Sequence, residues 1–258
     1  ALGHARHGTD RGVAKRCWEE SLAIYRTLAD QWGVAQALNR LGLLALDTGD
    51  YPTARHLLEE SVAICQTLAD RKSMAYALCY LGNVHANQGE LATAEELVGR
   101  SIAISHALGD RLGAAESMGC IAAALTYGGH FVQSAALFSQ SAAIFAELGT
   151  QHAYAYGIHN LAWANVNLGN YELARQQYLA AQAVWMERNH RHGLALSLLG
   201  LGEIALVFED FEQAQTLLAE GVARFAEIQQ RDEEAITLGS LASAWRGLGR
   251  RTEARLCV

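Results

Sequence analysis

The sequence predicts an all-α protein, a solenoid of antiparallel helix hairpins, from three observations. Residues 38–54 (LNRLGLLALDTGDYPTA) recur in related form every forty residues, with no insertion or deletion in the 258-residue chain. Alanine occupies two positions in all six copies, at forty-residue intervals from Ala23 and from Ala35. Apolar residues within each unit follow the spacing of one helical face. A strict period of this length indicates one continuous stack of repeated units.

The first half of the unit 31–70 is expected to be a helix, helix A, over about residues 33–47. Its apolar residues are spaced i, i+3, i+4 and i+7, at Leu38, Leu41, Gly42 and Ala45. Gly49 should end helix A, because glycine readily takes the left-handed conformation that closes a helix. Asp50 is suited to cap the helix that follows.

The second half of the unit should form helix B over about residues 51–69. Pro52 falls in its first turn, where the missing N–H is tolerated. The inner side is expected to carry Ala54, Leu57, Leu58, Ser61, Ile64 and Leu68. Small residues should allow the closest approach of neighbouring helices, at Gly42, Ala54, Ala63 and their equivalents. The turns are short, so successive helices should lie antiparallel.

The period also gives the domain organisation, a single solenoid over residues 1–258. Residues 1–30 are a partial repeat that keeps helix B, and 231–258 are a second partial repeat. The full repeats are expected at 31–70, 71–110, 111–150, 151–190 and 191–230. Neither end carries a polar capping element, so we expect a fragment of a longer protein. Apolar surface at such ends would also favour end-to-end self-association.

Composition narrows the classes of partner and compartment. The net charge is −7, whereas nucleic-acid-binding faces usually carry a basic excess, so no direct nucleic-acid partner is expected. No apolar run is long enough for a membrane helix, and no membrane partner is expected. The five cysteines are odd in number and form no C-x-x-C pair. They are interpreted as buried, reduced thiols, which suits a cytoplasmic protein.

Sequence motifs give no support to an enzyme. The chain contains no G-x-x-x-x-G-K-[ST] phosphate loop, no H-E-x-x-H pair and no G-x-S-x-G elbow, so neither catalysis nor a cofactor is expected. The close histidine pairs are His4 with His7, and His190 with His192. Each lacks a nearby third ligand, so we interpret them as part of a solvated end and a solvated turn, with no metal site.

The repeat pattern resembles that of the tetratricopeptide repeat. It combines Leu41-Gly42, Ala45, the Gly49-Asp50-Tyr51 turn and the small residue Ala54. The unit is about six residues longer than the common form and lacks its usual proline after helix B. The long form, with LEESVAI at 58–64 and LADR at 68–71, looks like the repeat arrays at the C-terminal end of bacterial signal-transduction (STAND-type) ATPases and related transcriptional activators.

This resemblance implies a right-handed superhelical solenoid whose helices A line a concave groove. The groove face of helix A is the face opposite the hairpin core. Side chains on it include amides, which can bond a peptide backbone, and aromatic rings, which supply rigid contact area. The candidate binding residues are Gln36, Asn39, Arg40, Tyr76, Tyr80, Asn83, Asn87, Tyr127, Tyr156, His159, Asn160, Trp163, Asn167, Glu203 and Arg246. An alternative for Tyr156, His159 and Trp163 is packing between repeats.

The expected function is therefore non-catalytic recognition of a protein or peptide segment in the groove. By resemblance, the chain would be the sensor or interaction arm of a larger bacterial signal-transduction protein, and a small-molecule effector is another ligand class consistent with such arms. The alternative is a structural spacer or self-associating scaffold with an inert groove.

Overall fold

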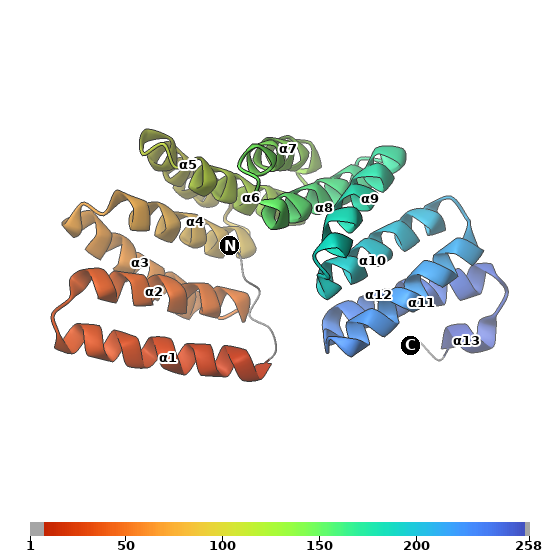
Figure 1. Ribbon diagram of the computed structural model, residues 1–258, viewed down its shortest axis with the longest axis horizontal. Helices are drawn as coiled ribbons and strands as arrows, with labels where there is room; N and C mark the ends of the chain where they lie inside the picture. Colours follow the sequence, from red (N-terminus) through yellow and green to blue (C-terminus); the bar gives the residue numbers. More distant parts are fainter. Residues whose placement is uncertain (1–7, 256–258) are drawn as a thin grey trace. The chain divides into compact units, whose positions relative to one another are not determined.

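The structure is a computed structural model that describes the backbone of residues 8–255 and the side chains of residues 12–255. Within this range all thirteen regular elements are α-helices and no residue lies in a strand (Figure 1), which confirms the predicted all-α class. In the described part of the chain no helix has the length and apolar character needed to cross a lipid bilayer.

The chain divides into two units, with the boundary between Leu148 and Gly149. The prediction of a single solenoid over the whole length stays a prediction. In the first unit the helices are α1 (Gly8–Thr27), α2 (Gln31–Asp47), α3 (Tyr51–Leu68), α4 (Arg71–Asn87), α5 (Leu91–Ala107), α6 (Arg111–Tyr127) and α7 (Phe131–Glu147). In the second unit they are α8 (Gln151–Asn167), α9 (Tyr171–Glu187), α10 (Arg191–Val207), α11 (Phe211–Glu227), α12 (Arg231–Gly247) and α13 (Arg251–Arg255).

Each unit is built from the predicted helical hairpins. The helices α2 and α3 form one hairpin, and α4 and α5 form the next. Within each unit successive helices pack on one another, and helices A of neighbouring hairpins also touch, as α2 does α4 and α4 does α6. The three helices A of the first unit, α2, α4 and α6, therefore form a continuous row (Figure 1).

The predicted turn chemistry is present between α2 and α3. Gly49 has a φ of 73°, in the left-handed region, and Pro52 lies in the first turn of α3. The Asp50 carboxylate accepts a hydrogen bond from the backbone N–H of Thr53 at 3.2 Å. This bond satisfies one of the free N–H groups at the start of α3, so the turn and the helix cap are encoded together.

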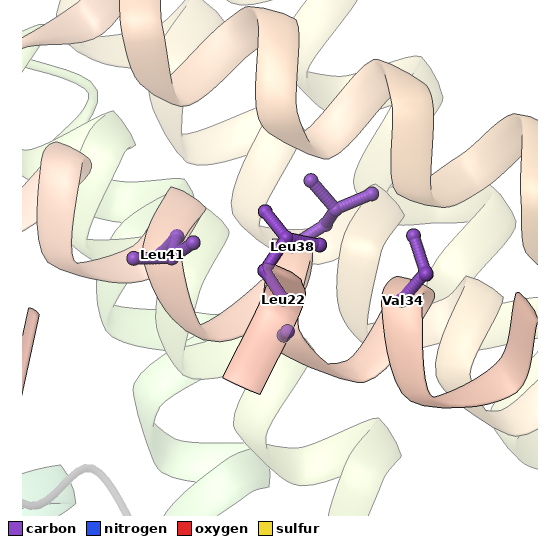
Figure 2. Packing of buried hydrophobic residues seen from close by; sticks show 5 residues of the cluster. Leu22, Val34, Leu38 and Leu41 are labelled. Carbon is purple, nitrogen blue, oxygen red and sulfur yellow. The ribbon is translucent and has the colours of Figure 1, made fainter. Parts of the chain in front are cut away.

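The core is a succession of small apolar clusters. The cluster between α1 and α2 contains Leu22, Val34, Leu38 and Leu41, with Leu22 reaching across from the neighbouring helix (Figure 2). Leu38 has no exposed surface. Complete burial of a leucine side chain contributes about 1.5–3 kcal/mol, so repetition of such contacts stabilises the stack.

Two of the three predicted close-approach positions are confirmed. A Cβ atom on Gly42 would lie 2.7 Å from the side chain of Leu58, and Ala54 is completely buried. Ala63 is exposed, so its predicted role as a contact between helices is wrong. The small buried residue of helix B is Ser61, whose hydroxyl donates to the carbonyl of Ala35 at 3.1 Å.

The prediction for Leu68 is also wrong, because this side chain is 41% exposed at the end of α3 and does not belong to the inner face.

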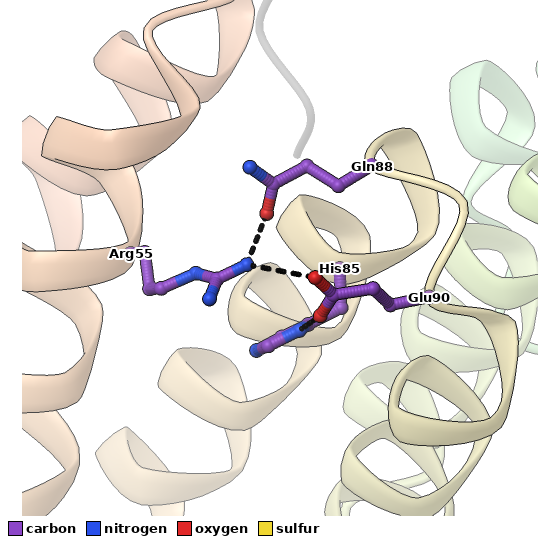
Figure 3. A network of polar contacts seen from close by, with 4 residues as sticks. All are labelled: Arg55, His85, Gln88 and Glu90. Carbon is purple, nitrogen blue, oxygen red and sulfur yellow. Dashed lines mark hydrogen bonds and ion pairs between the residues drawn. The ribbon is translucent and has the colours of Figure 1, made fainter.

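A polar network joins two neighbouring hairpins of the first unit (Figure 3). Arg55 on α3 donates to Gln88 and to Glu90, the latter at 3.4 Å, and Glu90 lies 2.5 Å from Nδ1 of His85. The hydrogen bond with His85 is the largest influence that lowers the pKa of the Glu90 carboxyl. His85 is buried, but the Arg55 and Glu90 side chains are 34% and 46% exposed, so the ion pair between them is expected to add little to stability.

Candidate functional site

The helices A of the first unit enclose a pocket of about 410 Å³. Its walls come from the groove faces of α2, α4 and α6, the face that sequence spacing selected. The lining residues are Trp32, Gln36, Asn39, Arg40, Lys72, Ser73, Tyr76, Cys79, Tyr80, Leu112, Glu116, Ser117 and Cys120. Five of the predicted binding residues therefore lie together: Gln36, Asn39, Arg40, Tyr76 and Tyr80.

The polar centre of the pocket is Asn39 on α2. Its side chain is 5% exposed, and its amide nitrogen donates to the backbone carbonyl of Ser73 at 3.4 Å. Gln36, one turn earlier, donates to the Ser73 hydroxyl at 2.5 Å. The side-chain oxygen of Asn39 has no hydrogen-bond partner among the described residues. A buried acceptor without a partner costs about 1–3 kcal/mol, so a ligand that donates an N–H or O–H to this oxygen would gain binding free energy.

Aromatic side chains form another part of the wall. Trp32 is 56% exposed, and its indole N–H donates to the carboxylate of Asp70 at 3.0 Å, which fixes the ring at the rim. Burial raises the pKa of the Tyr76 and Tyr80 phenols, so both hydroxyls stay neutral and can donate as well as accept.

The pocket carries charges of both signs. Arg40 and Lys72 are exposed on α2 and α4, and Glu116 is half-buried on α6. Opposite charges on facing helices suit an extended ligand that presents both donors and charged groups, and this arrangement does not select an anion alone.

The remaining predicted residues of the first unit lie outside this pocket lining. Asn83 is half-buried, and Asn87 is exposed and donates to the carbonyl of Asn83 on its own helix at 2.8 Å. Tyr127 is 77% exposed at the end of α6. Their participation in binding stays a prediction.

In the second unit, His159 packs inside the hairpin of α8 and α9. The centroid of its ring lies 5.1 Å from that of Tyr178 and 5.5 Å from that of Trp185. Burial, and then the charge of His192, lower the pKa of His159 to about 4, so this ring is neutral at pH 7. Its Nδ1 is buried with no hydrogen-bond partner among the described residues. The geometry of His159 is thus that of the packing alternative.

Tyr156 and the two histidines of the next turn extend this ring cluster. The Tyr156 hydroxyl lies 3.3 Å from Nδ1 of His192, and burial raises the pKa of this phenol to about 12. His190 accepts from the backbone N–H of Gly193 at 3.0 Å and caps α10. The interpretation of His190 and His192 as a solvated turn is therefore wrong, since both are half-buried and contact other rings.

The other predicted residues of the second unit are spread along α8, α10 and α12. Asn160 and Trp163 are half-buried, and Asn167 is exposed and donates to the carbonyl of Trp163 at 2.9 Å. Glu203 is half-buried and accepts from Ser240 at 3.3 Å. Burial raises its pKa. Arg246 is exposed and donates to Ser243 at 2.9 Å. Whether these residues contact a ligand stays a prediction.

Sequence reasoning missed several pocket residues. Trp32, Lys72 and Leu112 share one position of the repeat, in the first turn of helix A. The period could have found them, but the helix was expected to begin two residues later, at about residue 33.

The cysteines were interpreted only as packing residues. Cys65, Cys79 and Cys120 are indeed buried, although Cys79 and Cys120 also line the pocket. Cys17 is exposed, so its predicted burial is wrong. Cys257, His4 and His7 lie outside the described residues. In the range 8–255 no group of three or more metal-ligating side chains is arranged to hold an ion.

Comparison with known families agrees with this geometry. A family model of the tetratricopeptide repeat matches residues 34–72 and 74–110. The resemblance to tetratricopeptide arrays is confirmed, and the fold is that of such an array. A comparison with curated protein sequences gives no match.

Three solved structures illustrate the similarity. The signal-transduction ATPase with numerous domains (STAND) and a tetratricopeptide repeat sensor from Pyrococcus horikoshii has a TM-score of 0.73 and 13% identity, over 91% of this chain and 38% of that one. A Rap protein in complex with competence and sporulation factor has a TM-score of 0.70 and 12% identity, over 95% and 76%. Kinesin-light-chain repeats from Podosopora anserina have a TM-score of 0.61 and 21% identity, over 76% and 96%. The chain spans about two fifths of the length of the first structure, and at these identities the likeness concerns the fold.

Proposed function

We propose that the pocket formed by α2, α4 and α6 recognises an extended segment of a protein or peptide and that the chain is a non-catalytic interaction module. The observation that carries this proposal is Asn39, a buried amide in the pocket wall with an unpaired acceptor oxygen. This oxygen is covered in the structure, so Asn39 must turn its side chain toward the pocket to accept a backbone N–H of an extended segment. The tyrosines and Trp32 supply contact area beside it. The Rap protein of similar fold, solved with competence and sporulation factor, supports a peptide as ligand class.

The pocket's mixed lining also distinguishes among ligands. A small-molecule effector would have to satisfy Asn39 within about 410 Å³. An extended peptide can satisfy the same group and continue along the groove, toward Asn83 and Asn87 on α4. We therefore favour a peptide as the ligand. The alternative hypothesis, a structural spacer with an inert groove, would be supported by a negative binding experiment.

The experiment is a screen of an array of random blocked heptapeptides against the whole chain. Peptides retained by the wild type are measured again with Asn39→Ala and with Gln66→Ala as a control, because Gln66 is an exposed amide on α3 that does not line the pocket. Loss of one hydrogen bond to Asn39 should weaken binding about tenfold, equivalent to about 1.4 kcal/mol, and Gln66→Ala should leave it nearly unchanged.

N-methylation of single peptide amides identifies the donor. If one backbone N–H bonds Asn39, methylating it should cost the wild type as much as Asn39→Ala does, and cost the variant nothing more. Equal binding of wild type and Asn39→Ala to every retained peptide would refute the assignment. An array without any retained peptide would favour the spacer.

We further propose that this module is the sensor or interaction arm of a larger regulatory protein. The LEESVAI and LADR segments and the likeness to an ATPase whose sensor is a tetratricopeptide array support this context. Reading the coding sequence on either side of residues 1–258 tests it: a nucleotide-binding or DNA-binding domain is expected, and an uninterrupted non-regulatory protein would refute it. Light scattering of the isolated chain at several concentrations tests end-to-end self-association.

A further inference from the structure

Two thiols meet in the wall of the pocket. Cys79 lies on α4 and Cys120 on α6, and these helices are in contact. Both side chains line the pocket, although only 3% and 8% of their surfaces are exposed. Each thiol is the largest influence on the pKa of the other, in the sense of Cys79 as the proton donor and Cys120 as the acceptor. Two cysteines that are distant in sequence are thus adjacent across the seam between neighbouring repeats.

The surroundings make the two sulfurs chemically unequal. The hydrogen bond from Cys79, and a further one from Asn83, lower the pKa of Cys120 despite its burial and the nearby Glu116. The same hydrogen bond and burial raise the pKa of Cys79. The thiolate is the reactive form of cysteine, so Cys120 is the nucleophile of the pair and Cys79 keeps its proton. Burial raises the pKa of Cys65, whose sulfur lies 3.9 Å from the Ser61 hydroxyl.

We propose that Cys79 and Cys120 are a site of reversible oxidation, at which a peroxide converts the two thiols into a disulfide that links α4 to α6 beneath the pocket. The Cys120 thiolate attacks one oxygen of hydrogen peroxide and the O–O bond breaks. This step gives the sulfenic acid of Cys120 and hydroxide, which takes up a proton to become water. The sulfur of Cys79 then attacks the sulfenic sulfur, the S–O bond breaks, and the Cys79 proton leaves with the oxygen as a second water. Peroxide is reduced by two electrons and the thiol pair is oxidised by two.

The oxidant reaches the two thiols through the pocket, and the disulfide would in turn restrain the pocket walls. A small oxidant can reach the thiols only through the space between α2, α4 and α6, because both side chains are otherwise buried. Formation of the S–S bond would bring the two sulfurs to about 2 Å from each other, and so fix the spacing of two walls of the pocket. The inference stands on the paired thiols and holds whether or not the pocket binds a peptide.

The experiment treats the whole chain with hydrogen peroxide and measures intact mass and a non-reducing peptide map. We expect the loss of two hydrogen atoms, a linked peptide pair containing both cysteines, and recovery of both thiols with dithiothreitol. Cys17→Ser and Cys65→Ser should keep this behaviour, and Cys17→Ser also removes the exposed thiol that could link two chains.

The two single variants separate the roles. Cys79→Ser should stop at a Cys120 sulfenic acid that dimedone traps, whereas Cys120→Ser should react far more slowly and give no trapped adduct. Far-ultraviolet circular dichroism before oxidation checks that each variant is folded. The proposal is overturned if the folded wild type keeps both thiols while peroxide oxidises Cys17, or if Cys79 and Cys120 are oxidised separately without a linked peptide.

Discussion

Lowering the pH should destabilise the second unit through His159. Its pKa falls from about 6.5 in an unfolded chain to about 4 in the folded one, because burial disfavours the charged ring. The folded state therefore binds fewer protons than the unfolded state between these two values. The stabilisation is fully present above pH 6.5 and is lost as the pH falls toward 4.

The magnitude follows from the two pKa values. The difference of about 2.5 units corresponds to about 3 kcal/mol below pH 4, of which about 2 kcal/mol is lost by pH 5. Tyr178 and Trp185 on α9 face this ring and add no charge that would favour its protonation. His192 on α10 opposes it, and Glu233 on α12 lies 3.6 Å from His192.

Urea unfolding followed by tryptophan fluorescence, at several pH values between 7.5 and 4.5, measures this loss. The matched variant is His159→Leu, because leucine occupies the same position of the next repeat at Leu199. Leucine there changes packing equally at every pH, so only the slope against pH should differ. Wild type should lose about 2 kcal/mol more than the variant between pH 7.5 and 5. Parallel curves for the two proteins would show that the ring does not titrate as the structure requires.

Four further substitutions test the packing and the caps, each by urea unfolding. Gly193→Ala should lower the free energy of unfolding by about 1–3 kcal/mol, because the new Cβ would lie 2.2 Å from the Trp185 ring. Gly239→Ala should raise it by about 0.5–1 kcal/mol, because no atom lies within 4 Å of the new Cβ. Equal effects of the two substitutions would contradict this packing. Ala174 is completely buried, so Ala174→Leu should overpack the core and lower the free energy of unfolding by about 1–3 kcal/mol. An unchanged unfolding midpoint would argue against a close approach of neighbouring helices at this residue. Asp70→Ala removes the acceptor that caps α4 and should cost about 1–2 kcal/mol, while an effect below about 0.3 kcal/mol would mean that the cap is dispensable.

The repeat period was sufficient to place the helices and their turns. Gly49, Asp50 and Pro52 act locally, so their roles could be predicted without knowing what packs on them. Positions that depend on the neighbouring hairpin were harder. Ala63 is invariant in the six copies but exposed, and nothing in the structure explains its invariance. The residue that contacts helix A is Ser61, two positions earlier, whose equivalents in the other copies are serine, alanine or glycine.

The candidate site shows the same division between local and non-local information. Helical spacing put Gln36, Arg40 and Tyr76 on one face, and the structure brings them to one pocket. Spacing could not show that α4 would cover Asn39 while leaving its oxygen unpaired, since that depends on the carbonyl of Ser73 in the next hairpin. The thiol pair was hidden for a related reason, because its members occupy different positions of the repeat and meet only through the stagger between successive helices A.

One position of the repeat shows that the period predicts the location of a side chain on helix A but not its role. Asn39, Cys79, His159 and Leu199 are equivalent by spacing, and the helix geometry around them is the same. In the first unit this position supplies a buried amide with an unpaired acceptor, at Asn39, and a buried thiol in the wall of the pocket, at Cys79. In the second unit it supplies a neutral ring packed on Tyr178, and then an aliphatic side chain. The backbone fixes the direction in which the side chain points, and the side chain together with the neighbouring hairpin decides whether the space is filled by the protein or left for a ligand. Transferring Asn39 to the second unit as Leu199→Asn should therefore not create a binding site. It should create a half-buried amide that destabilises the fold.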